Sequence, residues 1–326
     1  MTSVSPRSSR QARTIRGPDV ATVDDVPQLN EVFADAFTER YRKDGMAGVR
    51  VPPLSGAIWR YAIEDAGEGA LCWRDGEGRI IAFNMVHQSG TEGWMGPLCV
   101  APSWQGAGLG KVMVQTGMQW LREHAASVIG LETMPRTMEN IGFYSNLGFL
   151  PGHLTITVTL DAVAGDAAPQ LLSRCSSQQK QEVVQACLGL TTQVMPGYDF
   201  TREIELTDYH AIGDTVILGA LEAPLGFALC HSAPLVEGRT RDELRVLKLV
   251  LSRQAHLPQM IGALTDLARR TGTRRVAIRL QGDYTEAYRT LMALGARVRW
   301  TDLRMSVFGW SELPPAEGMV LSNWEI

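Results

Sequence analysis

Three glycines at alternate positions mark the segment of the sequence best suited to binding a ligand. Residues 98–111 read Leu-Cys-Val-Ala-Pro-Ser-Trp-Gln-Gly-Ala-Gly-Leu-Gly-Lys, and the glycines stand at positions 106, 108 and 110. The segment begins like a buried strand, and apolar residues at helical spacing follow it from Val112 to Leu121. Glycine lets an anion approach the backbone closely, and a helix N-terminus offers free N–H groups. The segment therefore predicts a site for a phosphate or pyrophosphate.

The spacing excludes two common phosphate-binding motifs. A Walker loop requires glycine where Gln105 stands and Ser or Thr where Val112 stands. A dinucleotide fingerprint requires its third glycine three residues after the second, whereas Gly110 follows Gly108 by two. The pattern that remains is Gln-x-x-Gly-x-Gly. A glycine-rich turn without a ligand is the alternative interpretation of the same residues.

The elements that must position this loop alternate between strands and helices. We expect strands at 14–16, 70–74, 80–87, 94–100, 128–134 and 153–160. We expect helices from Asp24 or Asp25 through Phe37, at 58–63, after the glycine loop and at 138–147. This order predicts an α/β protein with a mixed sheet.

A second short motif supports a family resemblance. Residues 137–149 read Thr-x-x-Asn-x-x-Phe-Tyr-x-x-x-Gly-Phe, which resembles the Asn-x-x-Ala-x-x-Leu-Tyr-x-x-x-Gly-Phe segment of the GNAT superfamily of N-acetyltransferases. The Gln-x-x-Gly-x-Gly loop resembles the coenzyme A loop of the same family, and the order of the expected elements is the GNAT order. Thr137 and Asn140 depart from the family's asparagine and alanine. A hydrogen bond to pantetheine at these positions would therefore come from a different atom.

The second half of the sequence repeats the order of elements in the first. We expect strands at 245–251, 275–280 and 299–308, and helices at 258–270 and 285–294. Aligning Leu131 with Ile278 places Gly148 on Gly295. The same alignment replaces glycines 106, 108 and 110 by Arg253, Ala255 and Leu257, and Tyr144 by Leu291. We therefore expect two tandem GNAT-like acyl-CoA N-acyltransferase folds, of which the second is degenerate and shapes a pocket beside the first. An unrelated α/β domain is the alternative.

The expected domain organisation follows from this repeat. It comprises a flexible tail at 1–13, a GNAT domain at 14–162, a linker at 163–170, a degenerate GNAT-like domain at 171–312 and a C-terminal tail at 313–326. The tail ends in Leu-Ser-Asn-Trp-Glu-Ile, which is apolar and aromatic, so we expect it to dock on the protein itself.

The resemblance also implies which residues hold acetyl-coenzyme A, the expected co-substrate. Backbone groups of one strand would pair with pantetheine, the loop would hold the pyrophosphate, and the second motif would contact pantetheine. These residues are, in that order, Leu98, Cys99 and Val100; Gln105, Gly106, Ala107, Gly108, Leu109, Gly110 and Lys111; and Thr137 and Asn140. Tyr144 would protonate the departing thiolate, since a phenol stays protonated at neutral pH. Cys99 is interpreted as a small buried residue and not as a nucleophile.

The general base is harder to assign. Many family members carry a glutamate where Met95 stands, so another group must accept the proton of the amine. Glu132, on the next strand, is the expected catalytic base. Glu92, His87 and the C-terminal carboxylate of Ile326 are the other candidates.

The expected function is therefore that of an N-acetyltransferase. An amine would attack acetyl-coenzyme A directly in a ternary complex, with the first domain active. We expect a small-molecule amine, because the second domain would narrow the open cleft that a peptide requires; a peptide or protein amine is the rival acceptor. The alternative outside the enzyme class is a regulator or scaffold that binds coenzyme A with little catalysis. The sequence does not indicate an oligomeric state.

Composition bounds these expectations. The 326 residues are 45% hydrophobic and 20% charged with a net charge of −4, which argues against a nucleic-acid surface. Five cysteines form no Cys-x-x-Cys pair and six histidines no His-x-x-x-His pair, so we expect no metal site. We see no signal peptide and no segment long enough to span a bilayer, and we expect a cytoplasmic protein that does not bind membranes.

Overall fold

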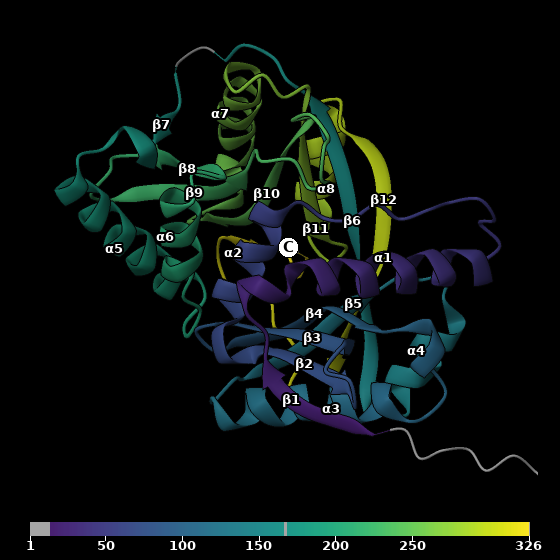
Figure 1. Cartoon of the computed structure of the whole chain (residues 1–326). Helices are drawn as coiled ribbons and strands as arrows, with labels where there is room; N and C mark the ends of the chain where they lie inside the picture. The colour runs from purple at the N-terminus through teal and green to yellow at the C-terminus, as the bar shows by residue number, and fades with distance from the viewer. Residues whose placement is uncertain (1–13, 166–167, 326) are drawn as a thin grey trace, which may run out of the picture.

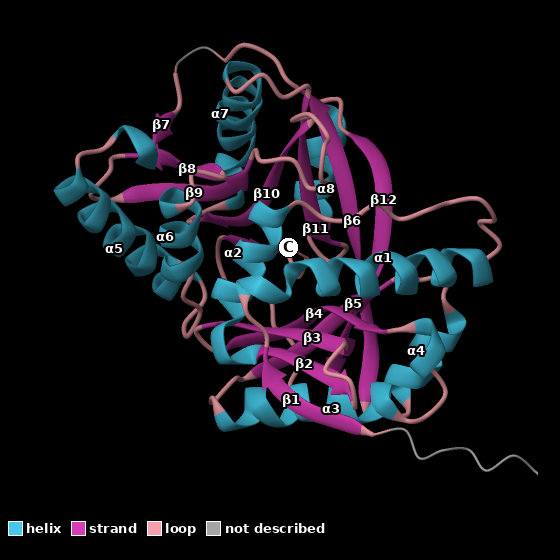
Figure 2. Ribbon diagram, in the orientation of Figure 1, coloured by secondary structure: helices cyan, strands magenta, loops and turns pink. Residues whose placement is uncertain are grey.

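The computed structural model describes residues 14–165 and 168–325, whose strands join in one continuous mixed sheet flanked by helices (Figures 1 and 2). The strands are β1 Ile15–Val20, β2 Ala70–Asp75, β3 Ile80–Ser89, β4 Glu92–Val100, β5 Val128–Thr133, β6 Phe149–Asp161, β7 Gln170–Leu171, β8 Gly213–Gly219, β9 Pro224–His231, β10 Glu243–Leu251, β11 Arg275–Gln281, β12 Arg297–Val307 and β13 Met319–Ser322. The helices are α1 Val26–Lys43, α2 Gly56–Ala66, α3 Leu109–Glu123, α4 Met138–Ser145, α5 Ser177–Val194, α6 Thr201–Tyr209, α7 Leu257–Arg270 and α8 Thr285–Ala293.

The expected α/β class and the elements of the first half are confirmed, with boundaries that differ by a few residues. The tail expected at 1–13 lies outside the described residues. The second half contains the five expected elements and also α5, α6, β8 and β9, which repeat α1, α2, β2 and β3. The alignment of the halves is supported by Gly148 and Gly295, which follow α4 and α8 and have left-handed φ angles of 94° and 90°.

The two halves exchange their last long strands. Strand β12 of the second half lies between β5 and β6, and β6 of the first half lies between β12 and β11. Figure 1 shows β6 and β12 running side by side through both halves. Each half therefore completes its sheet with a strand from the other, an exchange that the order of elements along the chain does not reveal.

The apolar residues form one core between the halves and one core within each. The shared core joins residues of α1 and α2, such as Leu29 and Trp59, to residues of α5 and α6, such as Cys187 and Ile204. On the opposite face, α3 and α4 cover the first half and α7 and α8 cover the second. Burial of this shared apolar surface stabilises the association of the halves.

The expected C-terminal tail ends in an ordered strand. β13 pairs with β10 from Met319 to Ser322, and the side chain of Trp324 is only 2% exposed. The expectation that the apolar end docks on the protein is confirmed. None of the helices in the described part of the chain is long and apolar enough to cross a bilayer.

Candidate active site

A cavity of about 540 Å³ lies beside the glycine loop, between elements of both halves. The first half contributes most of the lining, from α1, β4, β5 and α4. The residues expected at the site that line this cavity are Leu98, Cys99, Val100, Gln105, Gly110, Glu132, Asn140 and Tyr144. The second half contributes Leu235, Trp300, Asp302, Trp324 and Glu325. The cavity volume is within the usual range for small-molecule sites.

The edge of β4 is open along the cavity. β5 runs parallel to β4 and pairs with it only from Glu92 to Met95, within the described residues. The amide of Ala101 donates to the carbonyl of Ile81 at 2.8 Å. Because antiparallel pairs alternate, Cys99 then bonds to β3, whereas the N–H and C=O groups of Leu98 and Val100 point away from β3. These groups therefore face the side from which β5 has diverged.

The glycine loop combines left-handed backbone with open space. Gly106 and Gly108 have φ angles of 77° and 85°, and a Cβ on either would meet nothing within 4 Å. Gly108 caps α3, whose first N–H groups therefore face the loop. The side chain of Gln105 donates to the carbonyl of Val100 at 3.0 Å and accepts from Lys43 at 3.3 Å. The loop is thus held to the end of β4 with a cation beside it.

Six residues expected at the site do not line the cavity: Gly106, Ala107, Gly108, Leu109, Lys111 and Thr137. The first five belong to the loop and the start of α3. Thr137 is fully buried, and its hydroxyl donates to Asp44 at 2.8 Å. It joins the end of α1 to the start of α4 and does not offer its hydroxyl to the cavity. The amide of Asn140 lies 3.4 Å from the hydroxyl of Thr133.

Tyr144 and Cys99 line the cavity with their polar groups largely desolvated. Tyr144 is 6% exposed and packs against Phe143 and Phe149. Burial, followed by the nearby Cys99 sulfur, raises the pKa of the Tyr144 phenol above its ordinary value, so the phenol is protonated at neutral pH. Burial likewise raises the pKa of the Cys99 thiol, which opposes formation of a thiolate nucleophile.

The geometry argues against Glu132 as the base. Its carboxylate accepts a hydrogen bond from Thr155 and forms ion pairs with Arg279 and Arg304. Burial alone would raise the pKa of Glu132, but the two guanidinium groups outweigh it and hold the pKa below its ordinary value. A carboxylate bound in this way is a weak proton acceptor. Because both arginines come from the second half, the position of Glu132 in the sequence could not reveal this.

The other expected bases also have partners elsewhere. Glu92 is fully buried and accepts hydrogen bonds at 2.7 Å from Trp324 Nε1 and the Ser322 hydroxyl. His87 Nδ1 lies 2.5 Å from Asp65 Oδ2, and its ring stacks on Trp94. Neither residue lines the cavity. Ile326 lies outside the described residues.

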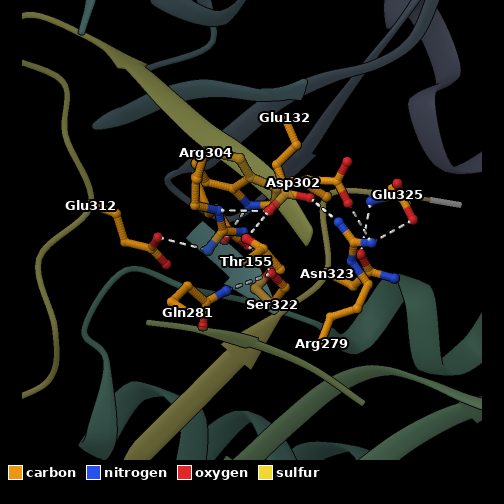
Figure 3. Close-up of polar contacts among 12 residues, drawn as sticks. Glu132, Thr155, Arg279, Gln281, Asp302, Arg304, Glu312, Ser322, Asn323 and Glu325 are labelled. Carbon is orange, nitrogen blue, oxygen red and sulfur yellow. Dashed lines mark hydrogen bonds and ion pairs between the residues drawn. The ribbon is translucent and has the colours of Figure 1, made fainter. Parts of the chain in front are cut away.

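A carboxylate that sequence reasoning missed does line the cavity. Glu325 follows Trp324 and lines the cavity. Its side chain is 51% exposed, and its Oε2 lies 2.9 Å from Arg279 Nη1. Figure 3 shows Arg279 between Glu325 and Asp302, with Glu132 and Arg304 in the same network. The aromatic end of the sequence was the available signal, but it predicted docking and not the position of a carboxylate.

The corresponding cleft of the second half is filled by the chain itself. β10 and β11 pair in parallel only from Glu243 to Arg245, in the same way as β4 and β5. From Lys248 onward β10 pairs with β13, and the hydroxyl of Tyr284 donates to the carbonyl of Val320 at 3.0 Å. Pro258 in the first turn of α7 also lacks a backbone N–H. Strand β13 therefore occupies the space that is open along β4.

No group of three or more His, Cys, Asp or Glu side chains in the described residues is arranged to hold a metal ion.

Comparisons with known proteins agree on the fold. Residues 28–149 match the model of the acetyltransferase (GNAT) family. A GCN5-related N-acetyltransferase from Sphaerobacter thermophilus is similar over 96% of this chain and 98% of its own, at 15% identity and a TM-score of 0.58. N-myristoyltransferase from Saccharomyces cerevisiae is similar over 96% of this chain and 86% of its own, at 12% identity and a TM-score of 0.64.

A tandem GNAT protein from the clavulanic acid biosynthesis pathway is similar over 90% of this chain and 98% of its own, at 14% identity and a TM-score of 0.57. The expected pair of tandem GNAT-like folds is thereby confirmed. No match to the sequence was found among curated proteins.

Proposed function

The chain belongs to the GNAT acyltransferases through residues 28–149, and from this premise we propose that it transfers an acetyl group from acetyl-coenzyme A to a primary amine. The observation that carries the proposal is the open edge of β4 beside an unobstructed glycine loop. The first half alone combines these two features, so we assign the reaction to it.

The coenzyme would lie across these two features. Amide-containing pantetheine would pair with the outward N–H and C=O groups of Leu98 and Val100, as an additional strand would. The pyrophosphate would meet the loop amides and the N-terminus of α3, where the helix dipole favours negative charge. Lys43, beside Gln105, would add a positive charge at the same end.

The acetyl group would then move by direct attack of the amine. A backbone N–H of β4 near Leu98 is suited to stabilising the developing oxyanion, a contribution of roughly 3 kcal/mol in other enzymes. The Tyr144 phenol, protonated and exposed to the cavity, would donate a proton to the departing thiolate. Cys99 would remain a thiol, because its burial opposes the anion.

The alternative function is coenzyme binding without efficient transfer. Met95 in place of a family glutamate favours it, and Tyr144 at the cavity opposes it. Thiol release from acetyl-coenzyme A in the presence of an amine panel distinguishes the two. Amine-dependent thiol release supports the transferase, whereas binding without release supports the regulator.

A matched pair of glycine variants tests the position of the coenzyme. Gly108 and Gly78 both have a φ of 85°, and a Cβ on either meets nothing within 4 Å. Gly108→Ala and Gly78→Ala therefore carry the same backbone strain, roughly 1–2 kcal/mol. We expect Gly108→Ala to weaken coenzyme A binding by at least tenfold, measured by calorimetry. We expect Gly78→Ala, in the β2–β3 hairpin, to leave binding unchanged. Equal affinities would contradict the assignment of the loop.

A further inference from the structure

The second half of the chain builds one wall of the cavity, and this wall differs chemically from the glycine loop. Its aromatic members are Trp300 of β12 and Trp324. Three aromatic residues of α1 line the same cavity: Phe33, Phe37 and Tyr41. Asp302 and Glu325 add two carboxylates to the same wall. Aromatic rings with nearby carboxylates form a surface suited to an apolar body that carries a positive charge.

Acidic and basic side chains are closely packed behind this wall. Four carboxylates meet in the network of Figure 3, namely Glu132, Asp302, Glu312 and Glu325, whereas Arg279 and Arg304 supply two guanidinium groups. Arg245 of β10 adds a third positive charge that acts on Glu325 from a greater distance. Arg136, whose guanidinium lies 5.5 Å from the centre of the Trp300 ring and 5.9 Å from that of Tyr41, adds a fourth positive charge, so the charges balance when all of these groups are ionised.

The close packing of the carboxylates is reflected in their pKa values. The Glu325 side chain is accessible from the cavity but is surrounded by protein. This desolvation, and then the neighbouring Asp302 and Glu132, raise the pKa of Glu325 to about 7, although Arg279 and Arg245 oppose the shift. Burial and Glu132 also raise the pKa of Asp302. Tyr41 of α1 lies near enough to interact with Glu325, and burial raises the pKa of its phenol, although Arg136 opposes the shift. An entering cation would relieve this repulsion.

We propose that the acceptor is a small primary amine that carries an aromatic ring. The ring would lie among the aromatic side chains of the cavity, and the ammonium would lie against Glu325, which removes the proton that must leave before attack. The inference rests on the proposed acetyl transfer and deepens it. It names the acceptor class and assigns the missing base to a residue of the C-terminal segment.

Glu325 suits this role better than Asp302. Asp302 is 4% exposed, and its oxygens contact Trp300 Nε1 and Arg279 Nη1, both at 3.1 Å. Glu325 contacts Arg279 through Oε2, and its Oε1 has no hydrogen bond within the described part of the chain. Glu325 therefore lines the cavity with an oxygen to which no described residue bonds, and Asp302 holds Arg279 in place.

The segment that carries Glu325 is fixed in place. Trp324 donates from Nε1 to Glu92 at 2.7 Å, and the Arg304 guanidinium lies 3.5 Å from the centre of the indole ring. The amide of Glu325 donates to Asn323 Oδ1 at 3.0 Å. A base held by such contacts loses little entropy when the acceptor binds.

The proton balance is complete without another reagent. The ammonium transfers one proton to the Glu325 carboxylate, and the neutral amine attacks the thioester carbon. The C–N bond forms, the C–S bond breaks, and the sulfur leaves as a thiolate that takes a proton from Tyr144. After the attack the nitrogen loses one more proton, which the Tyr144 phenolate takes up to become a phenol again. Glu325 then releases its proton to solvent. The products are the amide, the free thiol and one proton.

The test compares Glu325→Gln with Glu317→Gln, an exposed carboxylate of the same C-terminal segment. Thiol release from acetyl-coenzyme A is measured with 2-phenylethylamine, n-propylamine and phenylalanine. For the wild type, we expect kcat/KM for 2-phenylethylamine to exceed that for n-propylamine by at least tenfold. Phenylalanine should react more slowly than 2-phenylethylamine, because its carboxylate would face Asp302.

The effect of the variant separates a base from a structural residue. For the wild type and Glu317→Gln, kcat/KM should rise with pH up to about 7 and then become constant, since the base must be ionised. Glu325→Gln should lower kcat at least 100-fold, abolish this rise and leave coenzyme A affinity unchanged.

Two results would overturn the inference while acetyl transfer still occurs: equal rates for the two simple amines, or an unaltered pH profile in Glu325→Gln. Coenzyme binding with no thiol release for any amine would remove the proposed function as well, and so would loss of coenzyme binding in the wild type.

Discussion

The contact between Gly130 and Trp324 allows a direct test of how the C-terminal segment is positioned. A Cβ on Gly130 of β5 would overlap the six-membered ring of Trp324 and lie 3.0 Å from the Met305 carbonyl oxygen. Overpacking of this kind costs about 1–3 kcal/mol of the free energy of unfolding. Trp324→Ala removes a side chain that is 2% exposed, and such truncations cost about 3–5 kcal/mol.

The two substitutions should not be additive. Once the indole ring is absent, the methyl group of Gly130→Ala enters the space that the ring has left. We therefore expect the double variant to be about 1–3 kcal/mol more stable than the sum of the single effects predicts. Gly262→Ala in α7, where a Cβ meets nothing within 4 Å, serves as the control and should not be destabilising.

The assay is urea unfolding followed by tryptophan fluorescence and by circular dichroism. Gly130→Ala should also lower acetyl transfer at least tenfold with coenzyme A affinity unchanged, because a displaced Trp324 moves Glu325. Strict additivity of the two destabilisations, or full activity of Gly130→Ala, would show that the contact between Trp324 and Gly130 does not position the C-terminal segment.

Three further predictions follow from the rest of the molecule. Lys248→Met should destabilise the protein by about 3–5 kcal/mol in urea unfolding, because buried Glu92 and Glu203 lose the cation that lies 3.7 and 3.8 Å away; adding Glu92→Gln should recover part of this loss. Burial, with the charge of Asp65, raises the pKa of Glu203 to about 7, so its contribution to stability is present below about pH 4.5 and lost as the pH rises through 7. The stability of Glu203→Gln relative to wild type should therefore increase between pH 5 and 8, by up to roughly 3 kcal/mol, and a constant difference would count against this. A fragment of residues 1–165 lacks β12 and should show no cooperative unfolding transition, whereas a cooperative fragment would refute the dependence on strand exchange.

The glycine loop could be predicted because its signal is local. The apolar residues of β4, the glycines at 106 and 108 and the start of α3 are consecutive in the sequence, and their conformations depend mainly on their own residue types. The structure gives these glycines left-handed angles and open space, as the anion-site hypothesis requires. The same locality explains why α4 and its Tyr144 could be located from a short motif.

The wall that the second half of the chain contributes to the cavity could not be predicted, because it depends on pairing between strands that are distant in the sequence. Asp302 reaches the cavity only because β12 pairs with β5 and β6, and its alternating sequence fits many partners equally well. Glu132 has the right position for a base, but Arg279 and Arg304 of the second half neutralise it. The loss of the glycines predicted a degenerate second domain, but it did not indicate that β13 fills the second cleft.

We propose that the chain binds coenzyme A in its first half, whereas its own last strand, β13, occupies the second cleft. Isothermal titration of the full-length protein with coenzyme A tests it most directly. We predict one equivalent per chain for the wild type and for Gly272→Ala, a left-handed position after α7 that is remote from the loop, and at least tenfold weaker binding for Gly108→Ala. Two equivalents per chain, or one equivalent that Gly108→Ala does not weaken, would contradict the account.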